Sequence, residues 1–354
     1  MKIFYSGLLM IMILFLSSIA GFSQEKKNYL EEQEAEFNQR MKWFNEAKYG
    51  MFIHFGLYSQ LGGIYKGDDS GRYAEWIQSN AQIPKDDYIK LINTWNPENF
   101  DADKIVRLAK KAEMKYLVIT TKHHEGFCLW DSEYTDYDIS GSPMRGRDFI
   151  SELSNACKKY GLHFGTYYSI IDWNHPSQHI TVDPETQKKN WGQPTMKPGQ
   201  KAEYVQYMKD QIRELIEKYN TEILWFDGDW ANWWTLEDGN DMYQYIRELK
   251  PDIIINNRVS KRAIFKKDFG TPEQFHPEAS LKHYWEACYT MNDSWGFKIR
   301  DTDWKSPEEI YEKLKDINGK GGNFLLNVGP DGNGEVPEAS AKILLKVGKM
   351  LRKE

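Results

Sequence analysis

Short apolar segments alternate along this chain with amphipathic segments, and this alternation limits the possible folds more than any other feature of the sequence. The apolar segments are residues 50–59, 115–124, 163–171, 221–230, 252–260, 283–291 and 323–330. Apolar residues at helical spacing fill most of the stretches between them, such as 101–114, 148–161, 202–219 and 306–319. Strands that alternate with helices form a parallel sheet covered by those helices. We therefore predict an α/β fold, a (β/α)8-like (TIM-type) barrel that allows for fewer or irregular helices, although an eighth strand is not evident.

The two ends of the chain suggest its domain organisation. Lys2 is followed by an apolar run, residues 7–22, and small residues lie near Ser23, which is the pattern of an export signal. The run is shorter than the roughly 20 residues that cross a membrane. We predict a signal peptide at 1–23, cleaved near Ser23, and one catalytic barrel domain at 24–354, exported to the periplasm or the extracellular space without stable membrane insertion. The last residues read as a helix after the final strand, so no C-terminal β-sandwich is expected.

Composition narrows the classes of ligand. The chain carries 46 basic and 52 acidic side chains, for a net charge of −6, and it has no basic stripe suited to phosphate backbones. Nucleic acid is therefore not expected as a partner. Aromatic residues make up 14% of the chain, which suits either stacking on sugar rings or a large aromatic core. Cys128, Cys157 and Cys288 are too few and too widely spaced for a disulfide framework, so free thiols are expected, with a single bridge as the alternative.

Polar side chains gather at the carboxyl ends of the predicted strands. In parallel barrels, the active site is built at this end. The residues concerned are His54, His123, His124, Tyr167, Tyr168, Asp227, Arg258 and Glu286. Because nearly every strand contributes one or two such side chains at the same end, we expect a catalytic pocket at the mouth of the barrel.

Asp227 ends the fourth apolar segment, TEILWFDGDW, beside Trp225 and Trp230. A carboxylate at the edge of a core is costly unless it is paired or hydrogen-bonded, and such groups are common in active sites. Asp227 is therefore the first candidate for chemistry, with a turn-forming Asp as the alternative. For Asp229, in the same DGDW stretch, a turn-forming role and a functional role are equally compatible with the sequence.

Several carboxyl groups could act as a general acid. Glu286 is the only acidic residue in the apolar run HYWEACYTM, where burial would raise its pKa into the range of a general acid near neutral pH. The alternative is a core Glu that is neutralised by Arg258 or Arg300. Glu273, in a loop that would lie over the pocket, and Glu75 are competing acids.

The histidines allow a metal site as an alternative. His54, His123, His124 and Asp227 could supply zinc ligands, but the His-x-His expected on the first strand of a barrel metallohydrolase is absent. Neutral imidazoles that bind hydroxyl groups explain the same residues. The sequence also lacks a G-x-S-x-G elbow, a phosphate-binding loop and a dinucleotide-binding fingerprint. No metal and no cofactor are therefore predicted.

Taken together, the motifs of this chain resemble those of the α-L-fucosidases of glycoside hydrolase family 29. The resemblance covers roughly residues 40–350 and runs, in the family's order, through WFNEAKYGMFIHFGLYS, YAEWI, YLVITTKHHEGFCLWDS, FGTYYS, LWFDGDW, INNR, GTPEQ, WEACYTMNDSWGF and GGNFLLNVGPDGNGEVP. It implies a (β/α)8-like catalytic domain that hydrolyses α-L-fucosides with retention of configuration. Members of the family commonly carry a β-sandwich after the barrel, which is not expected here.

The resemblance also implies roles for particular residues. Asp227 corresponds to the nucleophile that forms a covalent fucosyl-enzyme, and Glu286, in the WE-x-C motif, corresponds to the acid/base, with Glu273 as the alternative. The motif positions that line the fucose pocket are occupied here by His54, Glu75, Trp76, His123, His124, Tyr168, Arg258 and Trp295. Retaining glycosidases need two carboxyl groups about 5 to 5.5 Å apart, one ionised and one protonated.

The function implied by this resemblance is that of an exo-acting retaining α-L-fucosidase, which releases terminal α-L-fucose from a fucosylated oligosaccharide or glycoconjugate by double displacement. Two alternatives from other classes are a metal-dependent barrel hydrolase and a catalytically inactive fucose-binding barrel. Activity that is insensitive to a chelator would exclude the first, and the presence of both candidate carboxylates argues against the second. The linkage, the natural glycan and the oligomeric state are not predicted.

Overall fold

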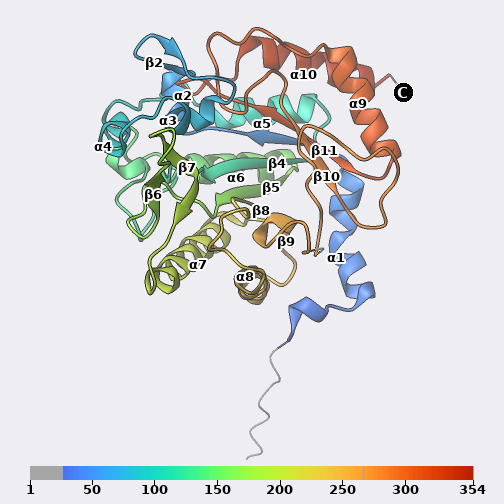
Figure 1. The fold of residues 1–354 in the computed structure, drawn as a ribbon. Coiled ribbons are helices and arrows are strands. Elements are labelled where there is room, and N and C mark those ends of the chain that lie inside the picture. Colours follow the sequence, from blue (N-terminus) through green and yellow to red (C-terminus); the bar gives the residue numbers. More distant parts are fainter. Residues whose placement is uncertain (1–26, 266, 354) are drawn as a thin grey trace, which may run out of the picture.

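The computed structural model describes residues 27–265 and 267–353, so the predicted signal peptide lies outside the described residues. Within this part of the chain, seven strands form one curled parallel sheet in the order β10-β11-β1-β4-β5-β8-β9 (Figure 1). The strands are β1 (Tyr49–Ile53), β4 (Tyr116–Lys122), β5 (His163–Ser169), β8 (Ile223–Asp227), β9 (Ile254–Ile255), β10 (Glu286–Tyr289) and β11 (Asn323–Val328). Each strand overlaps one of the seven predicted apolar segments, and the predicted α/β barrel architecture is confirmed.

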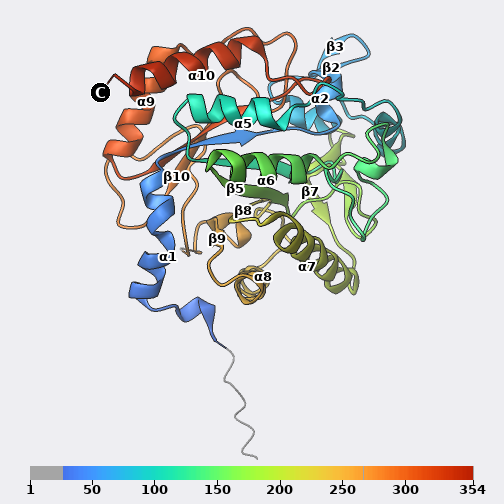
Figure 2. The same cartoon turned by 180° about the vertical axis from the view of Figure 1, so that it is seen from behind.

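Helices cover the outer face of the sheet (Figures 1 and 2). The long helices are α1 (Glu34–Ala47), α5 (Ala102–Lys111), α6 (Phe149–Tyr160), α7 (Gln200–Tyr219), α8 (Leu236–Leu249), α9 (Pro307–Gly319) and α10 (Glu338–Leu351). Asp101, Asp148 and Ser306 begin three of them, and each side chain accepts a hydrogen bond from a backbone N–H of the first turn, as N-cap residues do. The shorter helices are α2 (Tyr58–Leu61), α3 (Ile77–Asn80) and α4 (Lys85–Tyr88), and the 3-10 turns are η1 (Tyr29–Glu31), η2 (Ala74–Trp76), η3 (Ile89–Asn93), η4 (Ile139–Gly141) and η5 (Asn257–Val259).

The gap between β9 and β10 is bridged by residues 269–273, which follow the direction of the sheet without becoming a regular strand. On one side, Asn256, next to β9, forms a parallel bridge with Phe269. On the other side, the backbone N–H of Glu286 donates to the carbonyl of Gly270 at 2.9 Å. This segment occupies the place of the eighth strand, which the sequence pattern did not locate. Within the described chain, no α-helix lies between this segment and either neighbouring strand.

The sheet separates two apolar cores. A cluster inside the barrel includes Phe52 and Trp225, and a larger cluster between the sheet and the helices includes Phe226 and Ile212. Successive residues of a strand point to opposite faces, so each strand supplies side chains to both cores. For this reason every residue of β1, β4 and β11 is buried, as expected for a parallel sheet covered on both faces. Each large apolar side chain that is fully buried contributes about 1.5 to 3 kcal/mol.

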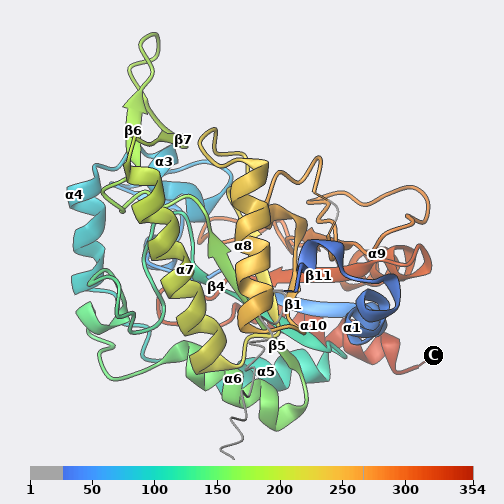
Figure 3. The same ribbon diagram turned by 90° about the horizontal axis from the view of Figure 1, so that it is seen from below.

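Two hairpins lie outside this sheet, and the sequence analysis predicted neither. One is formed by β2 (Ile64–Tyr65) and β3 (Asp68–Asp69), and the other by β6 (His179–Val182) and β7 (Lys189–Thr195). Figure 3 shows the β6–β7 hairpin projecting away from the rest of the molecule. After β11 the described chain forms α10 and no further strand. None of the described helices is both long enough and apolar enough to span a bilayer.

Candidate active site

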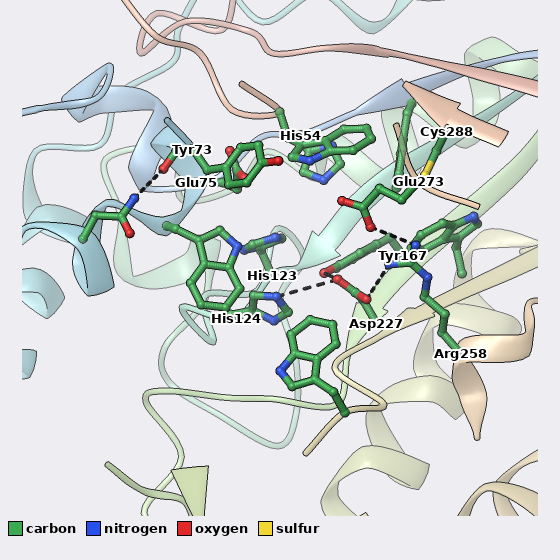
Figure 4. Close-up of a pocket in the computed structure, with 16 residues that line it drawn as sticks. His54, Tyr73, Glu75, His123, His124, Tyr167, Asp227, Arg258, Glu273 and Cys288 are labelled. Carbon is green, nitrogen blue, oxygen red and sulfur yellow. Dashed lines mark hydrogen bonds and ion pairs between the residues drawn. The ribbon is translucent and has the colours of Figure 1, made fainter. Parts of the chain in front are cut away.

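A pocket with a volume of about 360 Å³ opens at the carboxyl ends of the strands (Figure 4). Most of the residues predicted to react with the sugar or to bind it line this pocket, namely His54, Glu75, Trp76, His123, His124, Asp227, Arg258, Glu273 and Trp295. These side chains come from positions far apart in the sequence, and the parallel sheet brings them together because it places every strand end at the same edge. A monosaccharide-sized ligand fits a pocket of this volume.

Asp227, the last residue of β8, is held by two guanidinium groups. Arg258 Nη1 donates to Asp227 Oδ1 at 2.8 Å, and Arg262 Nη2 lies 3.3 Å from the same oxygen. The other oxygen, Oδ2, accepts a hydrogen bond from the hydroxyl of Tyr167 at 3.3 Å and lies 3.7 Å from His124 Nε2. Burial by itself would raise the pKa of Asp227, but the positive charges, above all that of Arg258, outweigh it and lower the pKa to about 2. The carboxylate is therefore ionised at neutral pH, and Oδ2 is its less constrained oxygen.

Asp229 is buried beside the pocket without lining it. Its carboxylate pairs with the guanidinium of Arg262, which donates from Nε at 2.9 Å and 2.8 Å to the two oxygens. This pair directs Arg262 toward Asp227 and places the guanidinium carbon 5.5 Å from the ring centroid of Trp230. The second carboxylate of the DGDW stretch thus orients an arginine.

Glu273 shares the guanidinium of Arg258 with Asp227. Arg258 Nη2 donates to Glu273 Oε2 at 2.9 Å, while Nη1 donates to Asp227. Two carboxylates bound to one planar guanidinium must lie close together, and both line the same pocket. The side chain of Glu273 is 37% exposed, compared with 13% for Asp227. Glu273 therefore lies at the mouth, where a leaving group would depart and water would enter.

Glu286, predicted as the acid/base, does not line the pocket in the structure. The residue is 0% exposed, and its two oxygens accept hydrogen bonds from Trp225 Nε1 at 2.8 Å and from the hydroxyl of Tyr116. Burial raises the pKa of Glu286 to about 7, as the sequence suggested. The physical reason that Glu286 does not line the pocket is its position along its strand. Glu286 begins β10, whereas the pocket lies at the carboxyl end of the strands and is reached by Cys288, two residues further along.

Tyr168, predicted to line the pocket, is also misplaced. Its hydroxyl donates to Gln211 of α7 at 2.7 Å and accepts from Lys122 Nζ at 3.0 Å, on the helix side of the sheet. Its neighbour Tyr167 lines the pocket instead. Adjacent residues of a strand point to opposite faces, so only one of the two tyrosines at the end of β5 can face the barrel interior.

The three histidines of the pocket are neutral at neutral pH. Burial lowers the pKa of His54 to about 3 and that of His124 to about 4, and it lowers the pKa of His123 well below its usual value. His124 Nδ1 lies 2.6 Å from the hydroxyl of Ser169, which itself donates to a carbonyl. His124 Nδ1 must therefore carry the proton, which leaves Nε2, on the Asp227 side, as a hydrogen-bond acceptor.

Two buried polar atoms of the pocket have no partner within the described part of the protein. They are Oε1 of Glu75 and Nδ1 of His123. The other oxygen of Glu75 accepts from the backbone N–H of Gly296 at 2.8 Å, and burial raises the pKa of Glu75 to about 7. Because an unsatisfied buried polar atom costs about 1 to 3 kcal/mol, these two atoms are poised to bind the polar groups of a ligand.

Sequence reasoning missed several lining residues, namely Phe52, Tyr73, Asn80 and Cys288. Strand alternation would have identified Phe52, which lies two residues before His54, and Cys288, which lies two residues after an inward-facing Glu286. Tyr73 begins the motif YAEWI, which supplied Glu75 and Trp76, and could have been found there. No signal in the sequence indicated Asn80, which lies in the irregular region between β1 and α5.

The alternatives based on metals and disulfides find no support in the geometry. Among the residues that the structure describes, no group of three or more His, Cys, Asp and Glu side chains is arranged to hold a metal ion. His54 Nδ1 lies 2.7 Å from the side-chain oxygen of Asn327. Cys128, Cys157 and Cys288 are all buried and free, which confirms the expectation of free thiols over that of a bridge.

Comparison with known proteins identifies the family of the chain. The chain matches the family described as Alpha-L-fucosidase over residues 17–354. It is 29% identical to the alpha-L-fucosidase of Dictyostelium discoideum, over 87% of this chain and 69% of the relative, and 28% identical to the tissue alpha-L-fucosidase of Homo sapiens, over 87% and 67%.

Solved structures of fucosidases share the fold. The alpha-L-fucosidase AlfC from Lactobacillus casei, in complex with its alpha-L-fucose product, is 37% identical with a TM-score of 0.79, and the match covers 89% of this chain and 99% of that one. An alpha-L-fucosidase from Bacteroides thetaiotaomicron is 29% identical with a TM-score of 0.79, over 88% of this chain and 73% of that one. With a family match over nearly its whole length and a pocket of paired carboxylates at the mouth of its barrel, the chain belongs to the α-L-fucosidases of glycoside hydrolase family 29.

Proposed function

We propose that this protein releases terminal α-L-fucose from fucosylated oligosaccharides or glycoconjugates by double displacement, with Asp227 as the nucleophile and Glu273 as the acid/base. The observation that carries this assignment is the guanidinium of Arg258, which binds both carboxylates at the mouth of one pocket. Retention of configuration requires two carboxyl groups about 5 to 5.5 Å apart that flank the scissile bond, and the shared guanidinium supports the assignment because it keeps these two carboxylates close together.

Asp227 is suited to attack the anomeric carbon. Its pKa of about 2 keeps it ionised, and Arg258 fixes Oδ1 so that Oδ2 is presented to the pocket. Attack by Oδ2 forms the fucosyl ester and breaks the glycosidic bond, and the electron pair of that bond leaves with the aglycone oxygen. The hydroxyl of Tyr167 stabilises the attacking oxygen without binding it as tightly as a cation would.

Glu273 is suited to transfer the proton. Its position at the mouth lets it protonate the departing oxygen in the first step and take a proton from the entering water in the second. Formation of the ester removes the negative charge of Asp227, which leaves Arg258 to stabilise the Glu273 carboxylate created by the proton transfer. The burial of Glu286 and the hydrogen bonds to both its oxygens favour Glu273 over Glu286 for this role.

The remaining side chains account for recognition of a 6-deoxy sugar. His54, His124 and the unpaired atoms of Glu75 and His123 supply hydrogen-bonding groups for three hydroxyls. The rings of Phe52, Trp225 and Trp295 supply an apolar wall for the methyl group and the C–H face of the ring. A pocket with buried polar groups of this kind discriminates strongly against sugars that lack a matching hydroxyl.

Kinetics with an aryl α-L-fucoside test the nucleophile. Asp227→Asn is expected to abolish turnover while the fold, measured by circular dichroism, is retained, and NMR of the wild-type reaction should show the α-anomer as the first product. A β-anomer as the first product would refute double displacement.

A second experiment tests the acid/base assignment. Glu273→Gly should reduce kcat/KM far more for an unactivated fucosyl disaccharide than for a nitrophenyl fucoside, since only the former needs protonation. Azide should restore turnover of the nitrophenyl substrate and yield α-fucosyl azide, because it attacks the fucosyl-enzyme in place of water and the configuration is again retained. The same treatment of a Glu286→Gly variant should yield no fucosyl azide. Fucosyl azide from the Glu286 variant and none from the Glu273 variant would identify Glu286 as the acid/base.

We also propose that the protein is exported, with residues 1–23 removed. The apolar run after Lys2 and the small residues near Ser23 support this proposal. Expression of the full chain in a bacterial host, followed by fractionation and N-terminal sequencing, tests it. A mature protein recovered outside the cytoplasm that begins after Ser23 is the expected result, and an intact N-terminus in the cytoplasm would contradict it.

A further inference from the structure

Glu286 raises a question of its own, because a fully buried carboxyl group that takes no part in the chemistry needs another reason to be there. It is 0% exposed, and no cation among residues 27–265 and 267–353 forms an ion pair with it. Its two hydrogen-bond donors are neutral groups, the indole N–H of Trp225 and the hydroxyl of Tyr116. Burying a carboxyl group without a charged partner is costly. We therefore seek the function of Glu286 in the two side chains that it holds in place, Trp225 and Tyr116.

The indole that Glu286 fixes is a wall of the active site. Trp225 lines the pocket two residues before Asp227 on the same strand. The guanidinium carbon of Arg258 lies 4.6 Å from the Trp225 ring centroid, and the ring of Tyr167 stacks on the indole at 5.7 Å with planes 18° apart. Two of the side chains that contact the carboxylate of Asp227, Arg258 at Oδ1 and Tyr167 at Oδ2, therefore rest on the same indole.

Tyr116 holds the second oxygen of the Glu286 carboxylate in place. It begins β4, on the opposite side of β11 and β1 from Glu286, so the Glu286 carboxylate ties two parts of the barrel floor together. The Tyr116 ring crosses directly over Gly50 of β1, where a side-chain carbon would collide with it. The Glu286 carboxylate thus has one oxygen on a fixed phenol and the other on Trp225, which leaves the indole little freedom to tilt.

We propose that Glu286 is a positioning residue that holds the Trp225 indole, and through it the guanidinium of Arg258, in the place where Asp227 and Glu273 are both bound. This inference rests on the proposed function, in which those two carboxylates carry the reaction. Glu286 begins β10, and Cys288, two residues further along, is the position of that strand that reaches the pocket. Glu286 therefore lies about 7 Å along the strand from the level of Cys288 and acts without lining the pocket.

A pair of substitutions at this position tests the proposal. Glu286→Leu removes both acceptors, so the indole is released, and kcat/KM is expected to fall by about 100-fold because a shift of the order of 1 Å in a catalytic group has that effect. The fall should be equal for a nitrophenyl fucoside and for a fucosyl disaccharide, since attack by Asp227 is impaired in both. Glu286→Gln should retain kcat/KM within about threefold, because its amide oxygen accepts from Trp225 and its nitrogen donates to the Tyr116 oxygen.

Tyr116→Phe serves as the matched control for a purely structural role. It removes one of the two hydrogen bonds of Glu286 but leaves the bond to Trp225. Tyr116→Phe and Glu286→Leu should both lower the melting temperature, yet only Glu286→Leu should lower kcat/KM strongly, measured well below either melting temperature. Equal kinetic losses in the two variants would mean that Glu286 acts only on stability and would overturn the proposal.

Two further outcomes separate this inference from the function on which it rests. If Glu286→Gln loses activity only on the disaccharide and azide restores the nitrophenyl reaction, Glu286 is a proton donor and the positioning role is wrong. If the wild-type protein cleaves no α-L-fucoside at all, the proposed function fails before any variant is compared. Wild-type activity together with undiminished activity of Glu286→Leu would refute the positioning role alone.

Discussion

Replacing Arg258 by Met is expected to bring the acid limb of the pH–rate profile into the measurable range. In the wild-type protein, Arg258 outweighs the effect of burial and keeps the pKa of Asp227 at about 2, below the range in which most enzymes remain folded. The substitution keeps much of the side-chain volume over Trp225 but removes the charge and the hydrogen bond at 2.8 Å.

The size of the change follows from the contact distance. Two unit charges about 4 Å apart interact by about 4 kcal/mol at an effective dielectric constant of about 20, and each 1.36 kcal/mol corresponds to about tenfold in proton affinity. Asp227 is only 13% exposed, so solvent screens little of this interaction. The pKa of Asp227 should therefore rise from about 2 to about 5 in the variant.

The assay is kcat/KM for a nitrophenyl α-L-fucoside from about pH 3.5 to pH 8. The variant should lose activity as the pH falls through about 5, whereas the wild type should show no acid limb from Asp227 in this range. Arg262→Met is the control, since Arg262 lies farther from Asp227, at 3.3 Å, and is 32% exposed, so its loss should move the limb by about one pH unit or less. An Arg258 variant whose acid limb coincides with that of the wild type would refute the electrostatic account of the Asp227 pKa.

Three further predictions follow from the geometry. Tyr167→Phe should lower kcat/KM about tenfold by removing the hydrogen bond to Asp227, whereas Tyr168→Phe should lower only the melting temperature, and equal kinetic effects would contradict the assigned faces. Incubation with a chelator should leave the fucosidase activity unchanged. A loss of activity that added zinc restores would instead support a metal-dependent hydrolase. Burial raises the pKa of Glu125 to about 7, so its contribution to stability is complete below about pH 4 and lost as the pH rises through 7; Glu125→Gln should flatten that decline in melting temperature.

Much of the fold was predictable because burial on both faces leaves a clear trace in the sequence. Each strand of a covered parallel sheet appears as a short apolar run, and all seven strands of the sheet overlap predicted runs. Residues 269–273 were missed for the opposite reason. They contain Gly270 and Pro272 and only one large apolar side chain, Phe269, so their membership of the barrel depends on the bridges to their neighbours and not on their own composition.

The sequence predicted where in the fold the site lies better than it predicted which side chains reach the pocket. A strand end can be recognised from the sequence, which correctly placed Asp227, Arg258 and the histidines at the mouth. Two further properties of a side chain depend on the exact residue at which its strand begins: the face of the sheet to which it points, and its height along the barrel axis. A run of apolar residues does not identify that first residue. Tyr168 was therefore assigned to the wrong face, and Glu286 to the wrong layer of the barrel.

The barrel is closed by residues 269–273, which do not form a regular strand. The two proposed catalytic carboxylates, Asp227 and Glu273, therefore lie on segments of the chain that can change independently. Asp227 ends a regular strand flanked by β5 on one side and β9 on the other, so a lengthened or shortened β8 would disturb the whole sheet. Glu273 lies on a segment that no α-helix of the described chain connects to β9 or to β10, and a loop follows it up to β10. Insertions and deletions in that loop can change the surroundings of Glu273, the proposed proton donor, and so the range of aglycones accepted, while Asp227, the proposed nucleophile, keeps its place.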